Sequence, residues 1–158
     1  MKIYEKRWQT IVPGKMDEVW DFFSNPANLQ KITPQEMNFE VLTNLRDISM
    51  YPGMLIRYKV SPIANIRMNW VTEITSVQPH EYFIDEQRFG PYALWHHEHR
   101  FEETHDGIQM SDILHYGVPL GILGQMVNGI MISQRIDHIF EYRQDVIKEI
   151  FQPKKSVL

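Results

Sequence analysis

The chain has 158 residues, of which 43% are hydrophobic and 23% charged, and its formal net charge is -4. These values are typical of one globular domain that buries roughly two-thirds of its unfolded surface. We expect no nucleic-acid-binding surface, because neutralising phosphates requires clustered Lys and Arg, and the basic pair Lys154-Lys155 lies in a short tail. The sequence has no cysteine, which excludes disulfides, thiolate nucleophiles and thiolate metal ligands.

The sequence contains neither a predicted signal peptide nor a predicted membrane-spanning segment. Residues 1–7 have no apolar core of the kind found in a signal peptide. Gly117–Ile132 is the most apolar stretch, but glycines, a proline and polar residues interrupt it, and it is shorter than the ~20 residues that a crossing needs. We therefore expect no membrane span, and a cytoplasmic location is the default for a cysteine-free chain.

The N-terminal region predicts a strand followed by two short helices. Residues 3–12 are rich in β-branched and aromatic side chains and end at Pro13-Gly14, which indicates a strand closed by a turn. Apolar residues at helical spacing over 16–24 predict a short amphipathic helix. Asn25-Pro26 is typical of an N-cap with proline in the first turn, so a second short helix should begin there and end before Thr33-Pro34.

From about Asn38 the period of the apolar residues changes to two, which predicts half-buried antiparallel strands. Proline and glycine turn signals separate the alternating stretches. Asp106-Gly107 predicts a tight hairpin between the last two strands. The expected strands lie at about 39–41, 54–60, 68–74, 82–88, 94–104 and 108–118.

The C-terminal region predicts one long helix of roughly 25–30 residues, from about Leu123 to Ile150. Its first half is nearly all apolar and should be buried or lie over a cavity, while its second half carries charges, including Arg135 and Arg143, and should keep a wet face. The order of the elements predicts a single α+β domain over 1–158. In it a curved antiparallel sheet of about seven strands wraps around the last helix and leaves room for an apolar cleft.

Several stretches of the chain carry a family resemblance. They are Asn25–Leu29, Ile32–Pro34, Trp70–Ile74, Phe83–Tyr92, Trp95–Phe101, Asp112, Tyr116, Pro119–Gly121 and the final helix. Together they resemble the ligand-binding branch of the SRPBCC superfamily, also called START-like or polyketide cyclase/dehydrase-like proteins. The resemblance implies a helix-grip fold with a hydrophobic cavity under the long helix. Members bind lipids, sterols, polyketides, plant hormones or quinones, others are cyclases or oxygenase domains, and no universal catalytic residue is implied.

Strand alternation predicts which side chains face the interior. Over 94–104 the aromatic residues share one face while the opposite face is charged or polar, so the aromatic face should point inward. The facing of 82–88 is the less regular one, and it decides whether Asp85 and Gln87 belong to the interior. The residues expected on the inner face are Phe83, Asp85, Gln87, Trp95, His97, His99, Phe101, Met110, Asp112, Leu114 and Tyr116.

The polar members of this inner face have three alternative interpretations. They form a hydrogen-bonded network that braces the sheet, because unpaired buried polar groups cost ~1–3 kcal/mol each; or they form the polar end of a ligand pocket; or an Asp–His pair acts as a general base. The candidate catalytic residues are Asp85, His97, His99, Asp112 and Tyr116. The His97-x-His99 pair with an aspartate would also suit zinc, but this spacing alone is a weak signal, so we predict no metal and no cofactor.

The first functional hypothesis is a noncatalytic protein that binds a hydrophobic small molecule such as a lipid, an isoprenoid or a polyketide-like compound. The alternative is a cyclase/dehydrase-type enzyme that uses an interior Asp/His pair as acid and base. A third is an interaction module that presents an apolar patch around Tyr82, Ile84 and Ile113, and a homodimer through that patch or a sheet edge is a related alternative. The predicted ligand-binding residues are Met68, Trp70, Phe83, Gln87, Trp95, His97, His99, Phe101, Met110, Asp112, Leu114, Tyr116, Val127 and Met131.

Overall fold

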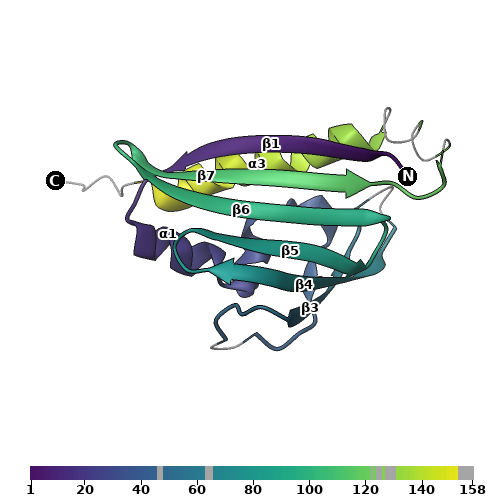
Figure 1. The fold of residues 1–158 in the computed structure, drawn as a ribbon, viewed down its shortest axis with the longest axis horizontal. Coiled ribbons are helices and arrows are strands. Elements are labelled where there is room, and N and C mark those ends of the chain that lie inside the picture. The colour runs from purple at the N-terminus through teal and green to yellow at the C-terminus, as the bar shows by residue number, and fades with distance from the viewer. Residues whose placement is uncertain (46–47, 63–65, 122, 124–125, 127–130, 153–158) are drawn as a thin grey trace.

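A computed structural model describes residues 1–45, 48–62, 66–121, 123, 126 and 131–152. Seven antiparallel strands form one sheet in the order β1-β7-β6-β5-β4-β3-β2. The strands are β1 Ile3–Val12, β2 Glu40–Val41, β3 Met54–Val60, β4 Met68–Gln78, β5 Tyr82–Phe89, β6 Leu94–Thr104 and β7 Gly107–Gly117. The helical elements are α1 Met16–Phe23, the 3-10 helices η1 Pro26–Ile32 and η2 Gln35–Met37, and α3 Ser133–Phe151. The helices lie on one face of the sheet, with α3 behind β1 and β7 (Figure 1), which confirms the predicted helix-grip α+β fold.

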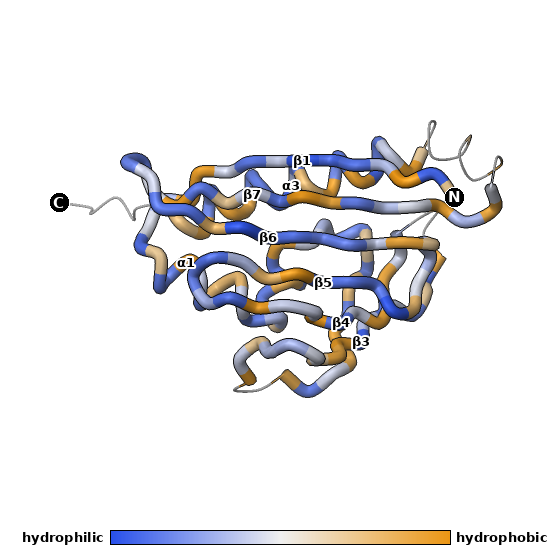
Figure 2. The backbone as a smooth tube through the Cα atoms, in the orientation of Figure 1, coloured by the Kyte–Doolittle hydropathy of each residue, from blue (hydrophilic) through white to orange (hydrophobic). Residues whose placement is uncertain are grey.

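The strands follow the predicted period of two. On β7, the alternate residues Met110, Asp112, Leu114 and Tyr116 are at most 3% exposed. The same alternation on β3 buries Met54, Ile56, Tyr58 and Val60, and the alternating polar and apolar residues are visible along the strands in Figure 2. Burial of this one apolar face against the helices is what holds the sheet in its register.

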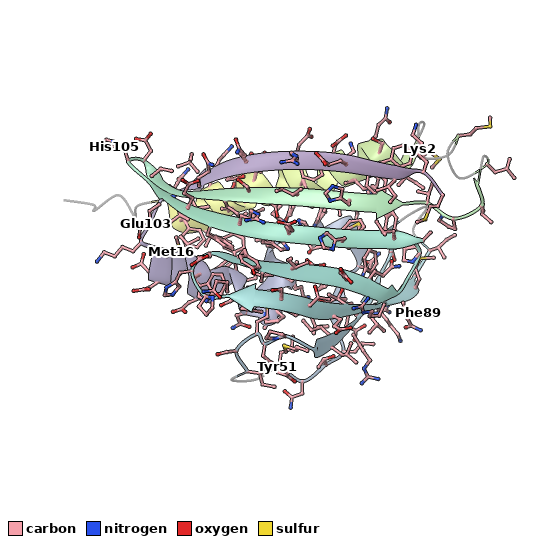
Figure 3. All side chains as sticks on the ribbon, viewed as in Figure 1. Lys2, Met16, Tyr51, Phe89, Glu103 and His105 are labelled. Atoms are coloured by element: carbon pink, nitrogen blue, oxygen red, sulfur yellow. The ribbon has the colours of Figure 1, made fainter. Side chains whose placement is uncertain are left out.

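The β6–β7 hairpin sets the position of the two central strands. Thr104 pairs with Gly107, so only His105 and Asp106 form the turn, at the end of the sheet where His105 is labelled in Figure 3. Gly107 has φ +131°, and a Cβ at this position would lie 2.5 Å from the carbonyl oxygen of Val12. Glycine is therefore required both by the backbone conformation and by the close approach of the chain. The tight hairpin predicted from Asp106-Gly107 is confirmed.

The outer face of the sheet is covered by charged pairs. Glu86 and His96 are 2.7 Å apart, and Arg100 pairs with Glu98 at 2.7 Å. In the strand register Glu98 lies directly between Ile84 and Ile113. The apolar patch proposed around these two residues is therefore interrupted by a carboxylate, and both side chains are half-buried.

Helix α3 packs on the inner face through a stripe formed by Ile136, Phe140, Arg143 and Ile147. Successive members are four, three and four residues apart, which places them on one side of an α-helix. Phe140 is 2% exposed and its ring stacks on Trp8 of β1, with ring centroids 3.8 Å apart. This aromatic pair fixes the helix to the edge strand of the sheet.

The C-terminal helix differs from its prediction in two respects. Helix α3 has 19 residues, fewer than expected, and part of the predicted first half lies outside the described residues. Leu123, Met126 and Met131, from that first half, are 68%, 60% and 51% exposed, so these side chains face solvent and not a cavity. Ile132 is buried and packs in the same cluster as Leu114 and Tyr116 of β7. Among the described residues, no helix combines the length and apolarity that a membrane crossing requires.

Truncating Phe140 tests the contact between α3 and the sheet. We expect Phe140→Ala to lower the free energy of unfolding by about 3–5 kcal/mol, because it removes a fully buried ring and leaves a cavity beside Trp8. Urea denaturation measures this change. The matched control Glu141→Ala, at an exposed position on the same helix, should change the stability by no more than about 0.5 kcal/mol. A loss at Phe140 as small as that at Glu141 would contradict the role of this stacked pair.

Candidate functional site

A cavity of about 150 Å³ lies between the inner face of the sheet, η1 and α3. Its walls are mostly apolar, and they come from β3, β4, β5 and β6 on the sheet side and from the short helices on the other. Its charged and titratable side chains are Asp85, His97, His99 and Arg143, together with the phenols of Tyr58 and Tyr92. Such an apolar cavity with a few placed polar groups is the usual form of a small-molecule site.

Helix η1 is held over the sheet by local hydrogen bonds. The Asn25 side chain caps it by accepting a hydrogen bond from Ala27 N at 3.0 Å. The Asn28 amide donates to the carbonyl oxygen of Phe22 at 2.9 Å, and the Thr33 hydroxyl donates to that of Leu29 at 2.7 Å. These bonds fix both ends of η1, and Leu29 and Ile32 consequently form part of the cavity wall. The predicted N-cap at Asn25-Pro26 is present.

Three aromatic side chains form one wall of the cavity. The ring centroid of Trp70 lies 5.6 Å from that of Tyr92 and 5.2 Å from that of Trp95, both in edge-to-face geometry. The ring centroids of Tyr92 and Trp95 are 4.8 Å apart. Gln87 holds Tyr92 in place: its amide donates to the Tyr92 carbonyl oxygen at 2.7 Å and accepts from Tyr92 N at 3.2 Å. Gln87 thus positions the aromatic wall without lining the cavity itself.

The strand register brings two aspartates and two histidines together. Asp85 pairs with His97 between β5 and β6, and His99 pairs with Asp112 between β6 and β7. His97 Nδ1 lies 3.3 Å from Asp85 Oδ2, and His97 Nε2 lies 3.0 Å from Asp112 Oδ1. His99 Nε2 lies 2.9 Å from Asp85 Oδ2, and His99 Nδ1 lies 2.9 Å from Asp112 Oδ1. We call these four side chains the Asp/His cluster.

Burial and hydrogen bonds within the Asp/His cluster have opposite effects on the pKa values of His97, Asp85 and Asp112. Burial is the largest influence on His97 and disfavours its charged form, but hydrogen bonds to Asp112 and Asp85 outweigh it and raise its pKa. Burial likewise raises the pKa of Asp85 and of Asp112, but hydrogen bonds from both histidines reverse this and leave each pKa below its usual value. The arrangement therefore favours a His97 imidazolium between two carboxylates. Both ring nitrogens of His97 are engaged, which leaves neither free to accept a proton from a ligand.

Arg143 is a functional candidate that the sequence analysis placed on a wet face. The structure corrects this: Arg143 is 8% exposed and lines the cavity. Its guanidinium lies 4.8 Å over the ring of Phe140, and its Nη1 is 3.9 Å from Asp112 Oδ1, too far for a hydrogen bond. Arg143 is spaced from Ile136 and Phe140 as a residue on the same buried side of the helix would be. The prediction placed it on the exposed side because its side chain is charged.

The structure brings six of the predicted site residues to the cavity wall. They are Trp70, Phe83, Asp85, Trp95, His97 and His99. Those that do not line it are Met68, Gln87, Phe101, Met110, Asp112, Leu114, Tyr116 and Met131, and Val127 lies outside the described residues. The reason is packing. Side chains of α1 fill the space above Phe101 and Met110, and α3 covers Leu114 and Tyr116. The cavity is consequently displaced toward β3, β4 and β5.

The cluster also has the geometry of a metal-binding group. Asp85, His97 and His99 each offer one ligand atom, and these atoms lie within 4.8 Å of one another. Imidazole and carboxylate donors suit zinc. The same atoms are already hydrogen-bonded to one another, however, so an ion would have to replace those contacts. The sequence-based prediction of no metal stays a prediction.

An antiparallel sheet that grips a helix around an apolar cavity defines a class of small-molecule-binding folds. Residues 12–140 match the family model described as "Polyketide cyclase / dehydrase and lipid transport". The chain therefore belongs to this family, as the resemblance to SRPBCC proteins implied. No curated protein matches the sequence significantly.

Solved structures show the same fold at low sequence identity. Protein CV1439 from Chromobacterium violaceum is 14% identical, with a TM-score of 0.70 over 95% of this chain and 99% of that one. The di-domain ARO/CYC BexL from the BE-7585A biosynthetic pathway is 15% identical, with a TM-score of 0.72 over 96% of this chain and 51% of BexL. Ara h 8.0201 is 9% identical, with a TM-score of 0.59 over 94% and 99%. At these identities the likeness concerns the fold.

The buried carboxylates predict a dependence of stability on acid. Because the pKa of Asp112 is lowered by folding, its contribution is present above its unfolded pKa of about 3.9 and is lost as the pH falls. We expect Asp112→Asn to cost about 3–5 kcal/mol at pH 7, since it leaves the histidines beside one carboxylate only. Its free energy of unfolding should then fall less steeply than that of the wild type from about pH 5 to pH 3.

Urea denaturation across this pH range measures both effects. Asp145→Asn, which removes an exposed carboxylate of α3, is the matched control and should follow the wild-type pH profile. Parallel profiles for the wild type and Asp112→Asn would contradict the ionised state assigned to Asp112.

The raised pKa of His97 predicts that part of the stability is lost as the pH rises, the opposite of the effect of Asp112. Protonated His97 stabilises the fold at low pH, and this contribution is lost as the pH rises through its folded pKa, above the usual value of about 6.5. An NMR titration of the histidine ring protons should show a His97 pKa above the usual value of about 6.5 in the wild type, and a lower pKa in Asp112→Asn. A His97 pKa at or below the usual value in the wild type would count against an imidazolium held between the two carboxylates.

Proposed function

We propose that the protein binds a small hydrophobic molecule in the cavity between the sheet, η1 and α3. The observation that carries this proposal is a partly open apolar cavity whose wall contains aromatic rings, three members of the Asp/His cluster and Arg143. Family membership supports it, because the family description includes lipid transport. Three aromatic rings provide apolar contact, and the charged side chains on the same cavity wall provide orientation.

The volume of the cavity favours a compact ligand. A cavity of about 150 Å³ is comparable to one that holds a single benzene ring. Drug-sized ligands occupy pockets of about 300–1,000 Å³. A lipid, an isoprenoid or a multi-ring polyketide would therefore have to widen the space between η1 and the sheet, whereas a single-ring compound fits without rearrangement.

Acid–base catalysis of the cyclase/dehydrase type is the second candidate. It is supported by the carboxylate of Asp85 and the imidazoles of His97 and His99 on the cavity wall, and by the family description. A general base needs a free lone pair within reach of the substrate. Asp112 and Tyr116 do not line the cavity, and both nitrogens of His97 face carboxylates. These contacts favour binding over proton transfer as the role of the cluster.

A variant that fills the cavity tests the binding proposal. Ile139 lies on the cavity wall and is half-buried, so Ile139→Trp should extend an indole into the space. We expect its affinity for toluene, a single-ring probe, to fall about tenfold or more relative to the wild type, a loss of about 1.4 kcal/mol. Thermal unfolding with and without toluene measures this, because a ligand that binds only the folded state raises the unfolding temperature.

Ile150→Trp is the matched control, since it makes the same substitution at an exposed position of the same helix. It should bind toluene as the wild type does. Native mass spectrometry of freshly purified wild-type protein would in addition detect a co-purified apolar compound. If the wild type carries no such compound and toluene does not stabilise it, the proposal is wrong.

A further inference from the structure

Arg143 is a buried cation that lacks a full set of hydrogen-bond acceptors. The side chain is 8% exposed, and Nε has no hydrogen-bond partner among the described residues. Nη1 approaches Asp112 Oδ1 only to 3.9 Å. A guanidinium offers five N–H donors, and burying charged donors without acceptors is costly. Stacking over Phe140 at 4.8 Å compensates the charge in part but supplies no hydrogen-bond acceptor.

The carboxylates nearby are already used by the histidines. Asp112 Oδ1 is hydrogen-bonded to His97 Nε2 at 3.0 Å, and His99 Nδ1 lies 2.9 Å away without hydrogen-bond geometry; both nitrogens are nearer than the guanidinium. Asp85 Oδ2 likewise has a nitrogen of each histidine within 3.3 Å. Arg143 therefore balances negative charge on the Asp/His cluster from 3.9 Å, but its Nη1 makes no hydrogen bond to Asp112 Oδ1. Its side chain lies instead on the wall of the cavity, which it lines together with Ile139 of the same helix.

We infer that the ligand of this cavity is a compact aromatic monoanion whose carboxylate is held by Arg143, an inference that rests on the proposed binding function. A planar guanidinium matches the two oxygens of a carboxylate, and hydrogen bonds between charged partners are about twice as strong as neutral ones. The ring of such a ligand would contact the aromatic wall formed by Trp70, Tyr92 and Trp95.

The charges around the site favour a single negative charge on the ligand. Asp85 lines the cavity and Asp112 lies directly behind the histidines, so two carboxylates already face His97, His99 and Arg143. A dianion such as a phosphate monoester would add two more negative charges to this buried region, where the single charge of Arg143 would have to meet both. The small volume also favours one ring with one carboxylate.

Benzoate and toluene form a matched pair of probes, because they share the ring and differ in the carboxylate. We expect calorimetric titration at pH 7 to show that the wild-type chain binds benzoate about tenfold or more tightly than toluene. Arg143→Met should lower the affinity for benzoate by about tenfold or more and leave the affinity for toluene within about threefold. Arg143→Lys keeps the charge but loses the planar pair of donors, so its affinity for benzoate should fall between the two.

Lys148→Met is the control for charge, since it removes one positive charge from an exposed position of the same helix. It should bind both probes as the wild type does. If Arg143→Met does not fold, as circular dichroism would show, Arg143→Lys and the wild-type Arg143 Nε–H resonance carry the test. That resonance should shift with benzoate and not with toluene.

The outcomes separate the two proposals. If the wild type binds toluene as tightly as benzoate, or if both arginine variants keep full affinity for benzoate, the inference about Arg143 is wrong while the binding function stands. If the wild type binds neither probe, the proposed function and the inference both fail.

Discussion

The placement of four ionisable side chains on the inner face of the sheet, three of them buried and Asp85 half-buried, is the constraint on which the rest of this structure depends. Asp85, His97, His99 and Asp112 come from three neighbouring strands, and each would be expensive to bury alone. Together they provide one another with polar partners, because every histidine nitrogen lies within 3.3 Å of a carboxylate oxygen. The register of β5, β6 and β7 must be held to a single residue for this to occur, since a slip by one would turn these side chains to the outer face.

The helices divide the space above the sheet into a filled part and an open part. Trp20 and Phe23 of α1 pack on Phe101 of β6, and Phe140 of α3 stacks on Trp8 of β1. Side chains therefore fill the space above these strands. Helix η1 covers the remaining strands; it is short, and side-chain hydrogen bonds connect it to the carbonyl oxygen of Phe22 in α1 and to that of Leu29 within η1. The cavity lies under η1, and the Asp/His cluster lies where the filled and the open part of this space meet. This position explains how the Asp/His cluster can be largely buried while Asp85, His97 and His99 still line the cavity.

Local sequence patterns were sufficient for the elements and for the facing of the strands. Alternation along 94–104 and 108–118 depends only on neighbouring residues, and it placed His97, His99 and Asp112 on one face correctly. The position of the cavity depends on which helix fills which part of the sheet, and strand patterns carry no such information. That is why Phe101 and Leu114 were expected on the wall but lie in packed clusters. Arg143 was misplaced because charge was weighted above helical spacing, although its stripe with Phe140 and Ile147 is regular.

The closed arrangement of the Asp/His cluster also limits what chemistry the site can perform. An imidazole that donates from both nitrogens to carboxylates is held in its charged form, and taking its proton away would leave two buried anions facing one neutral ring. Such a group is poorly suited to cycling between acid and base during turnover, but it presents a fixed electrostatic environment to a ligand. Arg143 approaches this environment from the opposite layer, on the helix that also contributes Ile139 to the cavity wall. A ligand bound there would contact the sheet through its ring and the helix through its charge, and would join the two layers of the fold where their own packing is incomplete.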